Sequence, residues 1–248
     1  MSLRFVVISE ARADFTTATE LADRVLCEQI EWLDEEMLDH QRQWVGELPH
    51  GLHLNWQSIP ERARKVGIKV HGHFDGKRGL PDAQAARRAI AYVRKEVGLV
   101  DALLLTRDAD DHAIRKRGLD QARNTDSHGY AIIMGVAICE RESWVVSGFQ
   151  AINDAEAGRL QEETQRLGWN PCLKSHQLTA GKDDTATKSP KRVLAALVGH
   201  DWARQRACWV DTPLAILRQR GIGNGLADFL QEVADRLVPL ITHRNKAR

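Results

Sequence analysis

The chain has 248 residues, of which 43% are hydrophobic and 28% charged, a balance that excludes an intrinsically disordered protein and a membrane-embedded one. Its formal net charge is only +1, so any affinity for nucleic acid has to come from local basic groups rather than from the field of the whole protein. The four cysteines show no C-x-x-C spacing, which argues against a zinc site or a disulfide framework. No apolar run is long enough for a secretory or membrane-spanning segment, so we expect a cytoplasmic protein.

The first part of the chain predicts strands that alternate with helices. Residues 3–9 form a short apolar run rich in β-branched side chains, which is typical of a buried strand. Residues 14–44 carry an apolar stripe with helical spacing. Residues 45–65 show no period and are interpreted as a connection, residues 67–74 alternate as a second strand, and residues 83–97 have helical spacing.

The pattern continues through the middle of the chain and then changes. Residues 100–106 form the most strand-like segment and run directly into an acidic stretch, DADD. A helix-compatible segment at 112–123 precedes a fourth apolar run at 130–139. Strands that alternate with helices indicate an α/β fold with a parallel sheet, and the segments beyond residue 150 are helical in character.

Acidic side chains follow two of the predicted strands at the point where each strand ends. Glu10 follows the first strand, and Asp108, Asp110 and Asp111 follow the strand at 100–106. Ligands of open α/β sheets collect at the carboxyl ends of the strands, and Mg²⁺ prefers hard oxygen ligands, so these acids are candidates for a magnesium site. Asp108 and Asp110 are expected to project to the same side, whereas Asp111 suits the cap of the following helix.

The same acids have a plainer interpretation. Carboxylates after a strand commonly cap the next helix or face water, and this is the better interpretation of DADD taken alone. An aspartyl phosphatase also carries Asp-x-Asp at a strand end, but Asp111 and His112 stand where that class has a threonine. From the residues alone, metal binding and helix capping stay open alternatives.

A hydrophobic strand that ends in Glu, followed by a later strand that ends in Asp-x-Asp, resembles the TOPRIM fold of topoisomerases, primases and OLD-type nucleases. The segments ISEARAD, LLLTRDADD, ERESWVVSG and KSPKRVLAAL resemble, in the same order, a bacterial family of TOPRIM-like proteins of unassigned function. The resemblance covers most of the chain. Genes of this family often lie beside ATPase genes.

The resemblance implies a TOPRIM-like metal-binding domain over residues 1–150, with a mainly parallel sheet flanked by helices, and a helical C-terminal extension over residues 151–248 that packs on it. It implies Mg²⁺ or Mn²⁺ as the cofactor, and the metal ligands would be Glu10, Asp108, Asp110 and Glu142. The catalytic residues would be Glu10, Asp108 and Asp110. Glu10 would act as general base or metal ligand, and Glu140 competes with Glu142 for the last place in the metal shell.

A nuclease must also neutralise phosphate charge. The candidate phosphate-binding residues are Arg12, Lys77, Arg78 and Arg107. Lys77 and Arg78 stand out because they lie between Gly76 and Gly79, and glycines allow a phosphate to approach the backbone. The cations expected to be ordinary solvated charge are Lys188, Lys191 and Arg192.

The leading hypothesis is therefore a magnesium-dependent nuclease that hydrolyses phosphodiester bonds in DNA or RNA. The resemblance places it as the effector of an anti-phage or toxin-like system that works with an ATPase partner. The alternative is a catalytically inactive TOPRIM-like module that docks on the ATPase. A homo-oligomer is compatible with either hypothesis, and no membrane partner is expected.

Overall fold

The computed structural model describes residues 2–48, 52–110, 114–125 and 128–246. By its internal contacts the chain divides into two compact units. Unit 1 comprises Met1–Arg107, Ile114–Gly135 and Glu232–Arg248, and unit 2 comprises Asp108–Ala113 and Val136–Gln231. This division differs from the boundary expected near residue 150, because the chain enters unit 2 earlier and returns to unit 1 for its last segment.

The main sheet has four parallel strands in the order β2-β1-β7-β8. The strands are β1 (Leu3–Ile8), β2 (Arg42–Val45), β7 (Ala102–Asp108) and β8 (Ala131–Ala137). Val6 of the central strand β1 pairs with Val45 on one side and with Leu103 on the other. The expected α/β class, with a parallel sheet flanked by helices, is confirmed at this level.

The strands in the middle of the sheet are hydrophobic on both faces. The side chains of β1 from Phe5 to Ile8 are fully buried, and so are Leu103 and Leu105 of β7. A strand that is buried on both faces needs a continuous apolar run and helices on each side of the sheet. This is why these short runs could be recognised as strands from the sequence.

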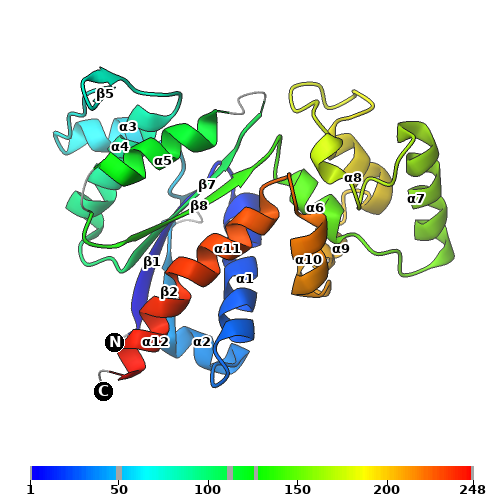
Figure 1. The fold of residues 1–248 in the computed structure, drawn as a ribbon, viewed down its shortest axis with the longest axis horizontal. Helices are drawn as coiled ribbons and strands as arrows, with labels where there is room; N and C mark the ends of the chain where they lie inside the picture. Colours follow the sequence, from blue (N-terminus) through cyan, green and yellow to red (C-terminus); the bar gives the residue numbers. More distant parts are fainter. Residues whose placement is uncertain (1, 49–51, 111–113, 126–127, 247–248) are drawn as a thin grey trace. The chain divides into compact units, whose positions relative to one another are not determined.

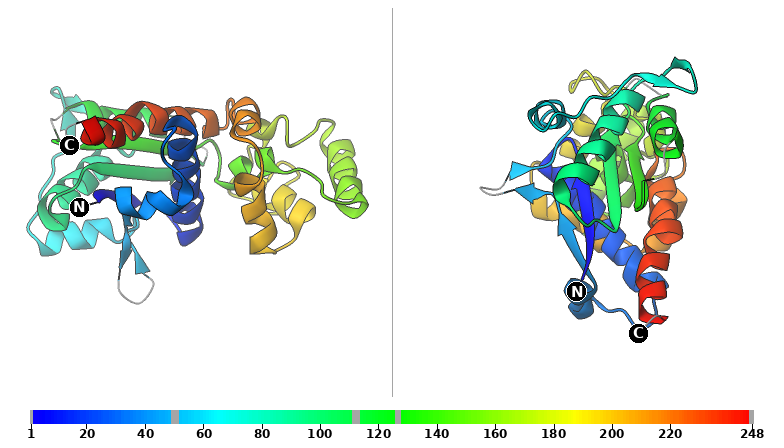
Figure 2. Two further views of the ribbon diagram at one scale, coloured as in Figure 1. Left: turned by 90° about the horizontal axis from the view of Figure 1, so that it is seen from below. Right: turned by 90° about the vertical axis from the view of Figure 1, so that its left-hand side faces the viewer.

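Helices cover both faces of the sheet in unit 1 (Figure 1 and Figure 2). Helices α1 (Arg12–Gln29) and α12 (Val238–Lys246) lie on one face, and α4 (Ala83–Tyr92) and α5 (Arg115–Thr125) lie on the other. The buried stripe of α1 consists of Ala18, Leu21, Ala22, Val25 and Leu26. Helix α4 continues into the π-helix η2 (Val93–Val97), so the helix expected at 83–97 is confirmed.

The single helix expected at 14–44 is wrong in its second half. Helix α1 ends at Gln29, and a short helix α2 (Glu35–Gln41) follows, capped by Asp34, which accepts a hydrogen bond from the Met37 N–H at 2.9 Å. The chain then forms the edge strand β2. Arg42 in β2 is buried, and its guanidinium pairs with Asp23 of α1 at 2.7 Å.

The segment at 67–74 does not form a strand of the main sheet. Only β5 (His73–Phe74) is extended, and it pairs with β6 (Lys77–Arg78) in a two-stranded antiparallel ribbon. The connection expected at 45–65 contains the antiparallel pair β3 (Glu47–Leu48) and β4 (Leu52–His53), followed by α3 (Ile59–Lys65).

Unit 2 is helical beyond β8. Its helices are α6 (Glu142–Gly148), α7 (Asp154–Leu167), η3 (Ser175–Gln177), α8 (Pro190–Val198), α9 (Trp202–Val210), α10 (Leu214–Arg220) and the first part of α11 (Leu226–Arg236). Trp144 of α6 stacks on Phe229 of α11, with ring centroids 5.3 Å apart. Within the described residues, no helix combines the length and the apolar character that crossing a membrane requires.

A buried asparagine connects the elements of unit 2. The Asn224 side chain donates to the Ser175 hydroxyl at 2.8 Å. Its backbone carbonyl accepts from the Ile138 N–H and from the Trp144 indole N–H, both at 2.8 Å. Asn224 lies in the loop between α10 and α11. It therefore connects three elements: the segment that follows β8, helix α6 and η3.

Candidate functional site

The end of β7 carries the first acid of the candidate site. Asp108 is the last residue of β7 and is half-buried. Its Oδ1 accepts a hydrogen bond from the backbone N–H of Arg141, at 2.9 Å. Arg141 lies just after β8, the neighbour of β7 in the sheet, so this bond joins the carboxyl ends of two adjacent strands within unit 2.

The backbone turns at Asp110. This residue has a φ of 47°, in the left-handed region that aspartate tolerates better than most residues, and its N–H donates to the Cys139 carbonyl at 2.9 Å. The expectation that Asp108 and Asp110 project to the same side assumed an extended strand, whereas the strand ends at Asp108 and the backbone at Asp110 is left-handed. Asp111, expected to cap the following helix, lies outside the described residues.

The two glutamates after β8 have different surroundings. Glu142 is half-buried, and its Oε1 lies 2.9 Å from Nη2 of Arg141. Glu140 is only 3% exposed, and its Oε1 lies 2.7 Å from Nζ of Lys191 on α8. The other oxygen of Glu140 is buried and has no hydrogen-bond partner in the part of the chain that the structure describes.

The Glu140–Lys191 pair changes the acidity of both groups. Burial raises the pKa of Glu140, although the hydrogen bond and charge of Lys191 act in the opposite direction. Burial acts to lower the pKa of Lys191, but the hydrogen bond and charge of Glu140, with smaller effects from Glu142 and Asp184, outweigh burial and raise it. Lys191 therefore keeps its positive charge throughout the neutral pH range.

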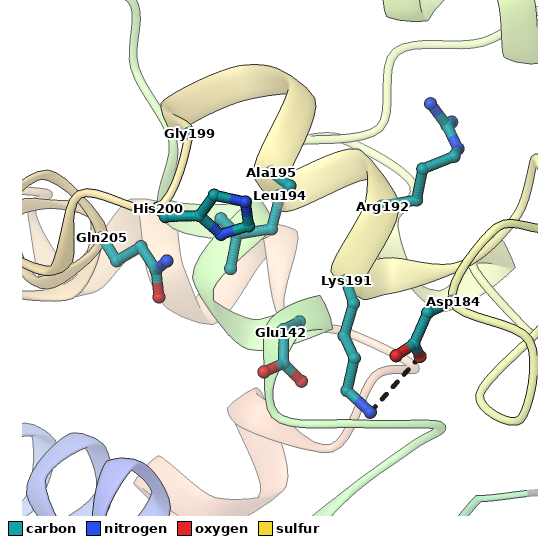
Figure 3. Close-up of a pocket in the computed structure, with 9 residues that line it drawn as sticks. All are labelled: Glu142, Asp184, Lys191, Arg192, Leu194, Ala195, Gly199, His200 and Gln205. Carbon is teal, nitrogen blue, oxygen red and sulfur yellow. Dashed lines mark ion pairs between the residues drawn. The ribbon is translucent and has the colours of Figure 1, made fainter.

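Lys191 faces a cavity of about 420 Å³ that lies within unit 2. Figure 3 shows the amine of Lys191 between the carboxylates of Glu142 and Asp184, and the Asp184 oxygen is 3.5 Å from Nζ. Arg192 points away from this amine and pairs with the buried Glu163 at 2.7 Å. A cation and two carboxylates therefore share the cavity with the polar side chains of His200 and Gln205.

Glu10 belongs to unit 1, where it lies beside an arginine. Its Oε1 is 3.7 Å from Nε of Arg107, and Nη2 of Arg107 is 3.3 Å from Asp82. Asp82 also pairs with Arg115 at 2.6 Å, and the Arg107 guanidinium lies over the Trp56 ring at 4.9 Å. Arg107, expected to bind phosphate, is thus already paired with two carboxylates.

The remaining basic residues predicted to bind phosphate lie at the surface of unit 1. Arg12 is exposed at the start of α1, and Lys77 and Arg78 are exposed in β6. Arg78 lines a cavity, whereas Lys77 is not among the residues that line it. Neighbouring residues of a strand point to opposite faces, which explains the difference.

The structure thus joins Asp108 to the segment Arg141–Glu142 in unit 2, and it places Glu10 in unit 1. Across the described residues, no group of three or more His, Cys, Asp and Glu side chains has the arrangement of a metal site. The sequence favoured ordinary solvated charge for Lys191 over phosphate binding, and its pairing with Glu140 was not predicted. A clue in the sequence was the Ser-Pro pair at 189–190, which is typical of the start of a helix. The Ser189 hydroxyl caps α8 and so fixes the first turn, which carries Lys191.

The chain was compared with protein-family models, with curated proteins and with solved structures. None of the three comparisons gives a match.

Proposed function

We propose that the protein is a TOPRIM-like, magnesium-dependent nuclease that hydrolyses phosphodiester bonds in nucleic acid. The observation that supports this proposal most directly is the hydrogen bond from the Arg141 N–H to Asp108. It holds a carboxylate from the end of β7 against the backbone that leads into Glu142, after the neighbouring strand β8. Acids at the carboxyl ends of adjacent parallel strands are well placed to act on one ligand.

The donor atoms in unit 2 suit Mg²⁺ or Mn²⁺. Asp108, Asp110 and Glu142 are half-buried carboxylates, and oxygen donors of this kind suit an ion that retains several waters. Glu140 is less suitable because it is buried and paired with Lys191. A bound ion of this kind would supply an activated water and polarise a phosphate oxygen.

Lys191 would supply a fixed positive charge for the phosphate. The Glu140 carboxylate holds the Lys191 amine in place. The Lys191 side chain is still 43% exposed, so the amine is accessible from the cavity. A donor that is already oriented stabilises charge developing on a phosphate oxygen without reorganisation during the reaction. The raised pKa of Lys191 suits it for binding an anion rather than for accepting a proton.

The roles of the remaining groups follow from the resemblance alone. We assign Glu10 the role of general base or further metal ligand, which requires it to exchange its contact with Arg107 for one with water or the ion. By the same resemblance we propose an ATPase as the partner of the nuclease.

The test is divalent-dependent cleavage of plasmid DNA and of single-stranded RNA. We expect Asp108→Asn and Glu142→Gln each to reduce the rate by about 100-fold or more, because each removes an anionic oxygen donor while leaving its size unchanged. Glu162→Gln is the matched control, since Glu162 is an exposed carboxylate on α7 away from the strand ends, and its rate should equal that of the wild type.

Calorimetry with Mg²⁺ separates the nuclease from its rival. The proposal requires the wild type to bind Mg²⁺ and Asp108→Asn to bind it more weakly. If the wild type neither binds the ion nor cleaves DNA or RNA, the proposal is overturned and the inactive module that docks on an ATPase is favoured.

A further inference from the structure

Unit 1 contains a cavity of about 580 Å³ next to the β5–β6 ribbon and the start of α4. The residues that line it include Gly72, His73, Arg78, Gly79, Asp82 and Arg88. Its volume is within the range of pockets that bind small molecules, about 300–1,000 Å³. The cavity lies entirely within unit 1, so its description does not involve the acids of unit 2.

The side chains in this cavity leave a surplus of positive charge. Arg78 and Arg88 make no side-chain hydrogen bond or ion pair with any residue that the structure describes. The one carboxylate in the lining, Asp82, is paired with Arg107 at 3.3 Å and with Arg115 at 2.6 Å. Two guanidinium groups are therefore available for an anion, and the planar fork of arginine matches phosphate oxygens in pairs.

The β5–β6 ribbon, which carries Arg78, is held in place by Arg87 and by its own backbone. The Arg87 guanidinium lies 3.6 Å from the centroid of the buried Phe74 ring and donates to the His73 carbonyl at 2.8 Å. Gly79 donates to the Gly72 carbonyl at 2.8 Å, and a Cβ at Gly79 would lie 2.6 Å from the Phe74 ring. The backbone that carries Arg78 is thus held in place before a ligand arrives, which reduces the entropy that the ribbon loses on binding.

The N-terminus of α4 also favours an anion in the cavity. Asp82 is the N-cap residue of this ten-residue helix, but its side chain makes no capping hydrogen bond. Gln84 and Ala85 of the first turn line the cavity, so the positive end of the helix dipole is directed towards it.

We propose that this cavity binds the phosphate group of a nucleotide, either free or at the end of a nucleic-acid strand. The two arginines supply the charge and the directional hydrogen bonds, and the volume leaves room for the sugar that carries the phosphate. The Gly72 and Gly79 backbone permits close approach. The inference does not depend on the metal site, because none of these groups belongs to it.

The test is equilibrium binding in EDTA, measured by calorimetry with adenosine 5′-monophosphate and by fluorescence anisotropy with a short single strand. The strand is used with and without a 5′-phosphate. We expect Arg78→Ala and Arg88→Ala each to weaken binding of the phosphorylated ligand by about 10-fold or more, the effect of losing a hydrogen bond to a charged group. The strand without its 5′-phosphate should bind more weakly to the wild type.

Lys77→Ala is the matched control, since Lys77 is an exposed cation on the same ribbon but is not among the lining residues. Its affinity should equal that of the wild type. An equal loss in Lys77→Ala and Arg78→Ala would overturn the proposal, because it would show unspecific attraction by surface charge. Absence of binding by every phosphorylated ligand would overturn it as well.

The comparison of ligands identifies the source of the phosphate. Tighter binding of the free nucleotide assigns the cavity to a nucleotide, and tighter binding of the phosphorylated strand assigns it to the strand end. The Asp108→Asn variant should bind as the wild type does, so a failed nuclease test and a failed phosphate test give different results.

Discussion

At the scale of single residues, the Glu140–Lys191 pair buries a charged carboxylate beside a cavity. A carboxylate that is 3% exposed is stable as an ion only if a cation accompanies it. Lys191 is that cation, at 2.7 Å, and the second Glu140 oxygen gains no partner within the described residues. The pair thus links the electrostatics of the cavity to the stability of unit 2.

We predict that Lys191→Met destabilises the protein in a manner that depends on pH. The pKa of Glu140 is already raised by burial, and removing Lys191 removes the influence that lowers it. A carboxyl whose folded-state pKa is raised contributes stability at low pH, and that contribution is lost as the pH rises through the folded-state pKa. The variant should therefore resemble the wild type near pH 4 and be less stable by roughly 1–3 kcal/mol near pH 8.

Chemical denaturation across this pH range measures the effect. The double variant Glu140→Gln with Lys191→Met is the control, since it has no carboxyl at this position and its stability should follow the pH dependence of the rest of the protein. A difference between Lys191→Met and the wild type that is the same at both pH values would contradict the assignment to Glu140.

At the scale of elements, the loop between α10 and α11 carries a strict backbone requirement. Gly225 has a φ of 90°, and a Cβ at this position would lie 2.0 Å from the Val136 carbonyl oxygen. The next residue back, Asn224, holds β8 and α6. Loop and strand therefore approach so closely that only glycine fits.

We predict that Gly225→Ala lowers the free energy of unfolding by more than about 2 kcal/mol, since the methyl group forces the loop away from β8. Gly223→Ala is the matched control. Gly223 also has a positive φ, of 83°, but its added Cβ would meet only the His176 side chain, at 3.3 Å. Gly223→Ala should lower the free energy of unfolding by only about 1 kcal/mol, the cost of placing alanine in a left-handed backbone conformation. Thermal unfolding compares the two, and equal losses would exclude the backbone clash.

The elements that could be predicted from the sequence are those whose pattern of apolar and polar residues lies within one short segment of the chain. Strands β1 and β7 are continuous apolar runs, and their ends mark Glu10 and Asp108 without further information. Strand β2 could not be predicted because RQWV is only four residues long and its first residue, Arg42, is buried through a contact with Asp23, which is distant in the sequence. The Glu140–Lys191 pair was missed for the same reason, since the two residues are far apart in the chain.

At the scale of the whole molecule, the two units are interleaved along the chain. Unit 1 is interrupted by Val136–Gln231 and completed by Glu232–Arg248. Glu232 pairs with Arg123 of α5 at 2.6 Å, and Val233, Leu237 and Ile241 are almost fully buried. The C-terminal segment is therefore part of the core of unit 1 and not an extension of unit 2.

We predict that a chain that ends after Gln231 loses several kcal/mol of stability, because burial of each of the three apolar side chains contributes roughly 1.5–3 kcal/mol. The milder variant Leu237→Ala should lose about 2–5 kcal/mol. Hydrogen exchange at the β1 amides is the measurement, and faster exchange is expected in both. Unchanged protection of β1 in the truncated chain would contradict the assignment of this segment to unit 1.

The interleaving also fixes an order of events during synthesis. All four strands of the main sheet have been synthesised once residue 137 is added, but α12, which lies on one of its faces, follows about a hundred residues later. At 5–20 residues per second this delay lasts roughly 5–20 s. During that time the nascent sheet presents apolar surface to the cell, so we expect this protein to require a chaperone until its last helix emerges.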